Sequence, residues 1–560
     1  MKALQVAVAI LFSLCSTAIM SYISMATPIG PWIETTLVLG ALLIFSLVRT
    51  SNFVQSLGLT TAAGGIGGIL ATGIGFSFPT LYFIDQATFV EWMKNPWYFS
   101  LVVGALSLAA GAWGMLIAHI CESKFIIQEK LAFPIGELVY KMISVQNQLA
   151  KAVQLAGGFL GTTAFLYIQQ CFSFMSRQLC LIPQPLPLFG GITIPSLIVS
   201  FDVIPMFLAV GFITGHVIAL PLLLGLAAKF LCIDPLHYYY PTLYAFVQNY
   251  ILSFVGLSSS YKPINAYDFS IAFGSGIVLY GAVGGLTFLP SAFYKMLKNG
   301  FSAKYEQSTR WSYEMLKKLP WLYIALVYTM TTLVLFYFQF SLLAQLYLLT
   351  FTTICTYQML YIAGKIGLAP LGRFATFVLV PALFLFNLTP VQITVIATFV
   401  EIAGGVACDT LFGRKMARLA SFEHASIVWF QWLGLLVSVM SVGLICWLLI
   451  AAFGLGNELG QLAVNKALGR ALLINCKNFD FSVLGMGFIF GYLLTFTRVS
   501  PVLVLGGILM QPNLSLLLIT GGFLASLVKS KKEDYYPLWS GVFAANSLWM
   551  IIKAFLGNFS

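Results

Sequence analysis

Long apolar runs separated by short polar connections make up almost the whole chain. A run of about 20 apolar residues is long enough to cross a bilayer as a helix. The runs lie at 3–26, 31–48, 56–84, 98–120, 153–175, 200–232, 243–257 (the weakest), 269–294, 320–338, 341–363, 373–388, 391–408, 425–453, 481–497, 500–528 and 538–556. They are too long and too little alternating for barrel strands. We therefore predict an all-α polytopic membrane protein with about 14 to 17 transmembrane or half-membrane helices.

The pattern also predicts how the chain is divided. The run at 200–232 is long enough for one tilted helix or for two broken halves, and Pro512 interrupts the run at 500–528. No stretch reads as a soluble domain, so residues 1–560 form a single transmembrane domain. The similarity between KLAFPIG (130–136) and KIGLAPLG (365–372) suggests two repeated halves, 1–300 and 301–560, as in many transporters.

Composition and charge support a membrane protein. Of the 560 residues, 59% are hydrophobic and 8% are charged, against about 25% charged in a soluble domain. The net charge of +11 comes mainly from connections such as 295–318, which is typical of cytoplasmic loops and does not indicate nucleic-acid binding. The expected location is multi-pass in a membrane, and the composition fits a bacterial inner membrane.

Several catalytic motifs are absent from the sequence. It contains no G-x-x-x-x-G-K-[ST], no H-E-x-x-H and no G-x-S-x-G, so neither ATP hydrolysis nor a motif-bearing hydrolase is indicated. The nine cysteines include no C-x-x-C pair and read as small apolar residues. We predict no enzyme activity, no cofactor and no bound metal.

A glycine-rich stretch occupies 61–75, where six of fifteen residues are glycine. Small residues let helices in lipid approach closely, which is the first interpretation. The alternative is a helix that opens locally and exposes its backbone to a cavity.

Ionisable residues within apolar runs indicate function, because each costs several kcal/mol unless it is paired or hydrated. Glu401 and Asp409 are eight residues apart, so they share one face of a helix. Desolvation favours the neutral form of an isolated carboxyl group, as a proton-coupled carrier requires. For Asp409, a salt bridge with Arg414 or Lys415 is the simpler alternative.

Three further ionisable residues are candidates of the same kind. Asp202 opens the 200–232 run, where it either caps a helix or binds protons. His216 lies within that run and belongs either to a proton relay or to packing. Glu137 follows Pro134 and Gly136, residues that can open a helix beside a polar cavity. The alternative is an ordinary ion pair of Glu137 with Lys130 or Lys141.

Six stretches resemble the oligopeptide transporter family, including its yellow stripe-like branch. The first, FIIQEKLAFPIGELVYKMI (125–143), is similar to the segment with the family's Leu-x-Phe-Pro-x-Gly core. The others follow in family order at 56–83, 201–231, 361–379, 407–434 and 540–557. Together they span most of the chain.

The resemblance implies a proton-coupled importer of small peptides or peptide-like metal chelates. It points to Phe133, Pro134, Gly136, Pro370 and Gly372 as residues that break helices beside a cavity. It also points to Asp409 and Lys415, which match the first Asp and the Lys of the family's loop Asp-Leu-Met-x-Asp-x-Lys-Thr-Gly. The chain departs from the family pattern at Tyr140-Lys141, Gly413, Met416-Ala417 and Ala545-Asn546. Coupling stoichiometry and substrate are therefore left open.

The leading hypothesis is a proton-coupled transporter of small oligopeptides that works by alternating access. Its partners are the substrate, protons and lipid, and a homo-oligomer is compatible with the sequence. A siderophore-type chelate symporter is the alternative within transport. A membrane enzyme or a structural membrane protein is the alternative from another class.

Overall fold

The computed structural model describes most of the chain, in segments separated by gaps. The described residues are 2–27, 33–48, 53–144, 148–171, 178–182, 186–187, 193–194, 197–200, 204–247, 269–270, 272–277, 279–280, 321–366, 369, 371–456, 462–474, 481–496, 499, 501–509, 512–528 and 532–557. The basic connection 295–318, Asp202 and Pro370 lie outside them.

Most of the described residues are helical. The α-helices are α1 (Lys2–Ala26), α2 (Glu34–Val48), α3 (Phe53–Ser77), α4 (Thr80–Ile84), α5 (Gln86–Met93), α6 (Pro96–Glu122), α7 (Pro134–Ser144), α8 (Gln148–Cys171), α9 (Pro205–Thr214), α10 (His216–Ala228), α11 (Asp234–Val247), α15 (Trp321–Tyr337), α16 (Leu342–Ile366), α17 (Leu371–Leu385), α18 (Pro390–Leu419), α19 (His424–Phe453), α20 (Asn465–Ile474), α21 (Phe481–Phe496), α22 (Pro501–Leu509), α23 (Pro512–Leu527) and α24 (Tyr536–Gly557). π-helical turns follow α6 at Ser123–Gln128 and α10 at Lys229–Ile233.

This architecture confirms the all-α polytopic class. Within the described residues, seven helices are long and apolar enough to cross a membrane, and several shorter apolar helices accompany them. The only strands described form two small antiparallel pairs, β1 (Gln178–Ile182) with β4 (Leu197–Ser200), and β2 (Leu186–Pro187) with β3 (Thr193–Ile194). The total of 14 to 17 spans includes undescribed segments and stays a prediction.

The chain folds into two compact units, each built from discontinuous segments. One contains residues 1–161, 285–467 and 534–560, and the other contains 162–284 and 468–533. These units are not the predicted halves 1–300 and 301–560, whose repeat relationship remains a prediction.

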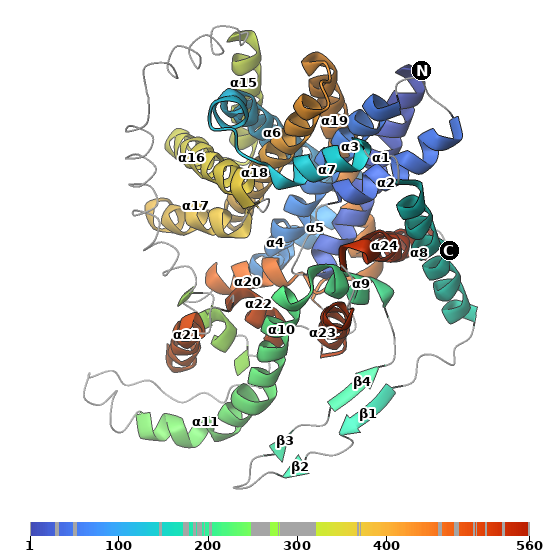
Figure 1. The fold of residues 1–560 in the computed structure, drawn as a ribbon. Helices are drawn as coiled ribbons and strands as arrows, with labels where there is room; N and C mark the ends of the chain where they lie inside the picture. Colours follow the sequence, from blue (N-terminus) through green and yellow to red (C-terminus); the bar gives the residue numbers. More distant parts are fainter. Residues whose placement is uncertain are drawn as a thin grey trace. The chain divides into compact units, whose positions relative to one another are not determined.

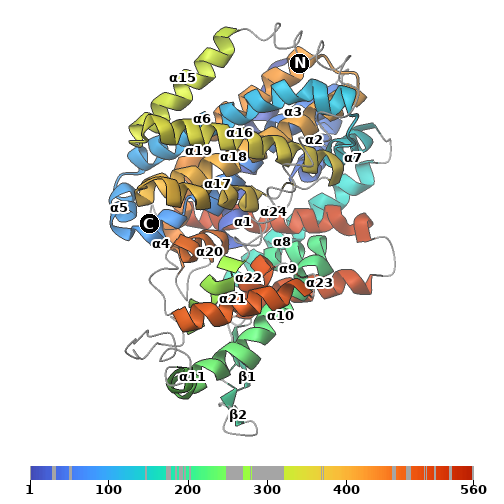
Figure 2. The same cartoon turned by 90° about the vertical axis from the view of Figure 1, so that its left-hand side faces the viewer.

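Helix α3 is the centre of the first unit. Every residue from Ser56 to Ser77 is buried, because α1, α2, α18 and α19 pack around the helix (Figure 1). On its other sides, α18 contacts α6, α16 and α17 (Figure 2). The two central helices α3 and α18 thus touch each other and carry the candidate site described below.

The glycines of α3 allow this close packing. A β-carbon on Gly67 would stand 2.5 Å from Ser438 Oγ of α19, and one on Gly73 would stand 2.9 Å from Ile402 Cγ1 of α18. The Ser16 hydroxyl of α1 donates to Gly64 O at 2.5 Å. The helix is continuous through the stretch, so the packing interpretation is confirmed and the locally opened helix was wrong.

An equally close contact between α19 and α3 gives a first testable prediction. A β-carbon on Gly434 of α19 would stand 2.1 Å from Ala63 O, so Gly434→Ala is expected to force the helices apart and to cost about 1–3 kcal/mol. The matched control is Gly157→Ala in α8, where no heavy atom lies within 4 Å. Thermal unfolding in detergent should show a lower Tm for the first variant only. Equal melting of the two variants would contradict the packing described here.

In the second unit both of the long apolar runs at 200–232 and 500–528 are divided into two helices. Gly215, with φ of +66°, ends α9 and begins α10, so the 200–232 run is two halves. The 500–528 run likewise divides into α22 and α23. Within this unit α9 packs on α23, and α10 packs on α22 and α23.

Two stretches that separate predicted apolar runs are partly helical in the structure. Residues 409–424, between the runs at 391–408 and 425–453, are not a connection, because α18 continues to Leu419 and turns into α19 only at 420–423. Residues 454–480, between the runs at 425–453 and 481–497, contain the amphipathic helix α20. Asp409 therefore lies inside a buried helix.

Candidate functional site

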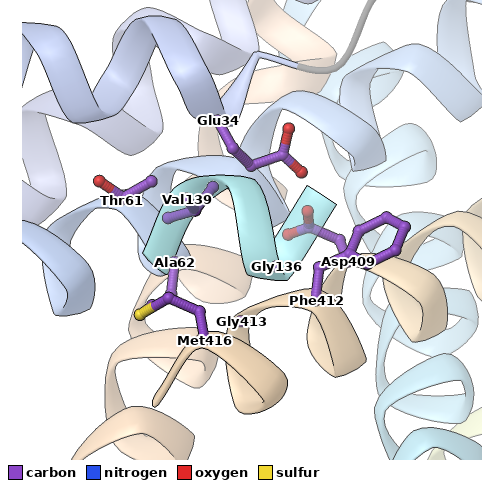
Figure 3. A pocket seen from close by; sticks show the side chains of 9 residues that line it. All are labelled: Glu34, Thr61, Ala62, Gly136, Val139, Asp409, Phe412, Gly413 and Met416. Carbon is purple, nitrogen blue, oxygen red and sulfur yellow. The ribbon is translucent and has the colours of Figure 1, made fainter. Parts of the chain in front are cut away.

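Two buried carboxyl groups face one another inside the first unit. Glu34, the first residue of α2, and Asp409 of α18 are 4% and 3% exposed, and their side chains interact directly. Both line a small cavity with Thr61 and Ala62 of α3 and Gly136 of α7, among other residues (Figure 3). Four helices therefore meet at one acidic pair.

A missing side chain on α3 makes room for this pair. A β-carbon on Gly65 would stand 2.8 Å from Asp409 Oδ2 and 3.2 Å from Glu34 Cγ. Any larger residue at position 65 would push the carboxyl groups away. The glycine-rich stretch therefore has a second role besides close helix packing, which is to leave room for the two carboxyl groups.

The acidic pair has no basic partner among the described residues. The ion pairs found there join Arg414 to Glu122, Lys415 to Glu137 and His424 to Glu122. The salt bridge between Asp409 and Arg414 or Lys415 is therefore absent, and that alternative was wrong. Arg414 and Lys415 follow Asp409 by five and six residues on α18 and point to other acids.

Most of the pair's oxygens also lack a hydrogen-bond donor. Apart from the contact between the two carboxyl groups, both oxygens of Glu34 and Oδ1 of Asp409 are buried without a donor from any other residue. Two carboxylates can become hydrogen-bond partners of each other only if one of them carries a proton. Mutual repulsion and desolvation both oppose full ionisation, so the arrangement favours the uptake of one positive charge.

The segment containing Phe133, Pro134 and Gly136 lies beside this pair. Phe133 is fully buried and has a positive φ of +47°, a strained conformation for a bulky residue. Its N–H donates to Gly364 O at 2.8 Å, and its ring packs edge-on against Phe412 of α18. Two neighbouring helices thus hold the non-helical residues just before α7.

The helix does not open at Pro134 and Gly136, contrary to the prediction. Pro134 is the first residue of α7, a position where its missing N–H costs no hydrogen bond. Gly136 is helical, and a β-carbon there would stand 2.5 Å from Phe412 O. The glycine thus allows α7 to pack closely on α18 next to Asp409, while the break precedes it at 129–133.

Glu137 has a basic partner, though not one of the neighbouring lysines first considered. Its Oε1 lies 3.8 Å from Nζ of Lys415, and that ammonium also donates to Leu131 O at 2.9 Å. The Glu137 side chain is 38% exposed, so the pair contributes about 0–1 kcal/mol. Lys415 and Glu137 form a bridge between α18 and α7 and do not belong to the acidic pair.

Glu401 occupies a separate place on α18. It is fully buried, and the Ser77 hydroxyl donates to its Oε2. A β-carbon on Gly372 of α17 would stand 3.4 Å from Glu401 Oε1, so Gly372 lies next to this acid. Eight residues correspond to about 12 Å of helix rise, and Glu401 does not line the cavity of the pair.

The remaining predicted candidates do not join the site. Asp202 and Pro370 lie outside the described residues. His216 begins α10 in the second unit and is exposed. The break at Gly215 places it at the start of the second half of the 200–232 run.

A second polar cluster joins the ends of α6, α18 and α19. Arg414 Nη1 lies 2.6 Å from Glu122 Oε2 and 3.3 Å from His119 Nδ1, and His424 Nε2 lies 3.1 Å from Glu122. A guanidinium only donates, so His119 Nδ1 is the acceptor and carries no proton. Gln431 accepts from Arg414 Nε at 3.3 Å.

Sequence reasoning missed Glu34, the partner of Asp409. Its position at the start of the 31–48 run was a usable signal, since a carboxylate at the edge of an apolar run is costly. It also missed the contact between His119 and His424, which are 305 residues apart in the chain and have no local pattern to link them.

Comparison with models of known protein families finds no match. Comparison with curated proteins finds none either.

Proposed function

We propose that the protein is a secondary active transporter that takes up small oligopeptides together with protons by alternating access. It would cross a bacterial inner membrane many times, with the end of α18 that carries Arg414 and Lys415 facing the cytoplasm. It would act without a cofactor and would not be an enzyme.

The observation that supports this proposal best is the buried pair of Glu34 and Asp409. A buried charge without a partner destabilises the fold. A buried pair of acids without a basic partner is therefore best explained by a function that needs it, namely the binding of a positive charge. In a transporter this charge is the coupling ion. Glu401 remains a second candidate for proton binding, because it is an acid buried in the same helix.

The position of the pair gives further support. The stretches that resemble the oligopeptide transporter family at 56–83, 125–143 and 407–434 contribute α3, α7 and the end of α18. These are three of the helices that line the cavity. We propose on this basis that the resemblance reflects membership of that family.

Uptake into proteoliposomes tests the proposal. The purified chain, reconstituted into vesicles, is expected to accumulate a mixture of short radiolabelled peptides when the outside is made acidic, and to stop when a protonophore is added. Ferric chelates added as competitors distinguish the two substrate classes, since inhibition of peptide uptake would indicate a shared site. Peptide accumulation that is the same with and without the gradient would overturn the proposal.

A further inference from the structure

We propose that α7 is a movable gate over the cavity of the acidic pair, with residues 129–133 as its hinge and Lys415 as its latch. The inference rests on the proposed function, because it names the element that would open the pair to water during transport. Three observations support it: the place of α7 at the cavity, the strained backbone before it, and the lysine that ties it to α18.

Helix α7 separates the cavity from the surface of the first unit. Its buried residues Gly136, Val139 and Ile143 lie on one stripe of the helix, and the first two line the cavity (Figure 3). Leu138, on another side, is 44% exposed. With 11 residues the helix is about 16 Å long, too short to span a membrane. It can therefore move without carrying a membrane span with it.

The acids need such a movement, because they are closed off in this structure. Glu34 and Asp409 are 4% and 3% exposed, and a proton that enters or leaves them must meet water. The other lining helices have no free side next to the cavity. Ser56–Ser77 of α3 and Gln392–Phe412 of α18 are buried throughout, and none of the described residues of α2 is exposed.

The five residues before α7 have the irregular backbone of a hinge. Lys130 and Phe133 have φ of +50° and +47°, in the left-handed region that residues with a side chain rarely adopt. A π-helical turn at Ser123–Gln128 comes just before them, and such turns are frequent at functional sites. Because a strained backbone relaxes when it leaves these conformations, the strain favours opening.

Helix α16 fixes the base of this hinge. Phe125 is fully buried, and its ring centroid lies 4.9 Å from that of Tyr357. A β-carbon on Gly364 would stand 2.7 Å from Leu131 Cδ1, and the Phe133 N–H donates to Gly364 O. Movement of the segment is therefore passed on to α7.

Lys415 of α18 ties the hinge and the gate together. Its Nζ donates to Leu131 O at 2.9 Å and lies 3.8 Å from Oε1 of Glu137, in the first turn of α7. Loss of this ammonium would release both contacts and leave the apolar packing of α18 unchanged. We therefore expect the gate to open more often without Lys415.

Labelling of a thiol inside the cavity tests the inference without transport. Thr61→Cys places this thiol on α3, where the Thr61 hydroxyl is buried without a hydrogen-bond partner. The purified chain in detergent is treated with a water-soluble methanethiosulfonate, and mass spectrometry of the peptide that contains residue 61 separates its rate from those of the native cysteines. Lys415→Met is expected to raise the rate about tenfold, because it removes a hydrogen bond from a charged donor.

Two variants at the exposed Lys130 test the hinge. Lys130→Gly and Lys130→Ala remove the same side chain, but only glycine adopts a positive φ freely. Glycine therefore stabilises the closed gate, and Thr61→Cys is expected to react about threefold more slowly with it than with alanine. Equal rates would exclude 129–133 as the hinge.

The control thiol is Thr72→Cys, at a position on α3 that is 2% exposed and outside the cavity. It should react slowly with and without Lys415→Met. An equal rise at both positions would show general loosening and would overturn the gate, as would an unchanged rate at residue 61. Peptide uptake by a chain whose labelling does not change would leave the transport proposal intact, so the two proposals fail separately.

Discussion

Asp409→Asn and Glu34→Gln are each expected to abolish accumulation of peptide against its gradient while leaving the chain folded. One proton crossing 100 mV supplies about 2.3 kcal/mol, which corresponds to an accumulation of about 50-fold. An amide of the same shape cannot release a proton to drive the cycle. The expected accumulation ratio in proteoliposomes therefore falls to about one, because only passive equilibration remains.

The control for these variants is Glu91→Gln. Glu91 is an exposed acid of α5 that lies outside the cavity, and its loss removes the same charge without touching the pair. Substrate exchange between equal concentrations on both sides separates coupling from binding, since it needs no net proton movement. Accumulation that persists in both Asp409→Asn and Glu34→Gln would rule out the pair as the coupling site.

Arg414→Met is expected to destabilise the first unit by about 3–5 kcal/mol. The Arg414 side chain is 3% exposed and that of Glu122 is 14% exposed, so removal of the guanidinium leaves a buried carboxylate whose remaining ion-pair partner is the His424 imidazole. The double variant Arg414→Met with Glu122→Gln should recover most of this loss, because neither charge then remains buried without its partner. Chemical unfolding of all four chains gives the double-mutant cycle.

Lys415→Met serves as the comparison for Arg414→Met. Its pair with Glu137 is longer, at 3.8 Å, and half-exposed on the acid side, so the ion pair itself contributes about 0–1 kcal/mol. If Arg414→Met unfolds no more easily than Lys415→Met, the cluster at the ends of α6, α18 and α19 does not stabilise the fold as described.

The fold class could be predicted from the sequence because hydrophobicity is a local property. The runs at 98–120 and 425–453 correspond to α6 and α19 within a few residues. The extension of α18 through 409–419 was missed, since Asp409, Arg414 and Lys415 suggest a polar connection. In the structure, partners on α2, α6 and α7 lie beside these three residues, and such partners are long-range contacts that no local window contains.

The candidate site could be predicted only in part, for the same reason. Asp409 was identifiable because an acid within an apolar segment is costly. Its neighbour Glu34 lies 375 positions earlier in the chain, and the contact exists because Gly65 leaves room on the helix between them. Gly136 lines the same cavity as Asp409, but the local roles of Pro134 and Gly136 are helix initiation and close packing, which were not predicted from the sequence.

The complete burial of α3 has a consequence for biogenesis. The helix is made early in translation, whereas α18 and α19, which cover two of its sides, emerge from the ribosome only after several hundred further residues. Until then its glycine-lined surface faces lipid or insertion machinery. A chain that ends before α18 would leave that surface uncovered. We therefore expect cellular quality control to act at the step at which α18 and α19 pack onto α3.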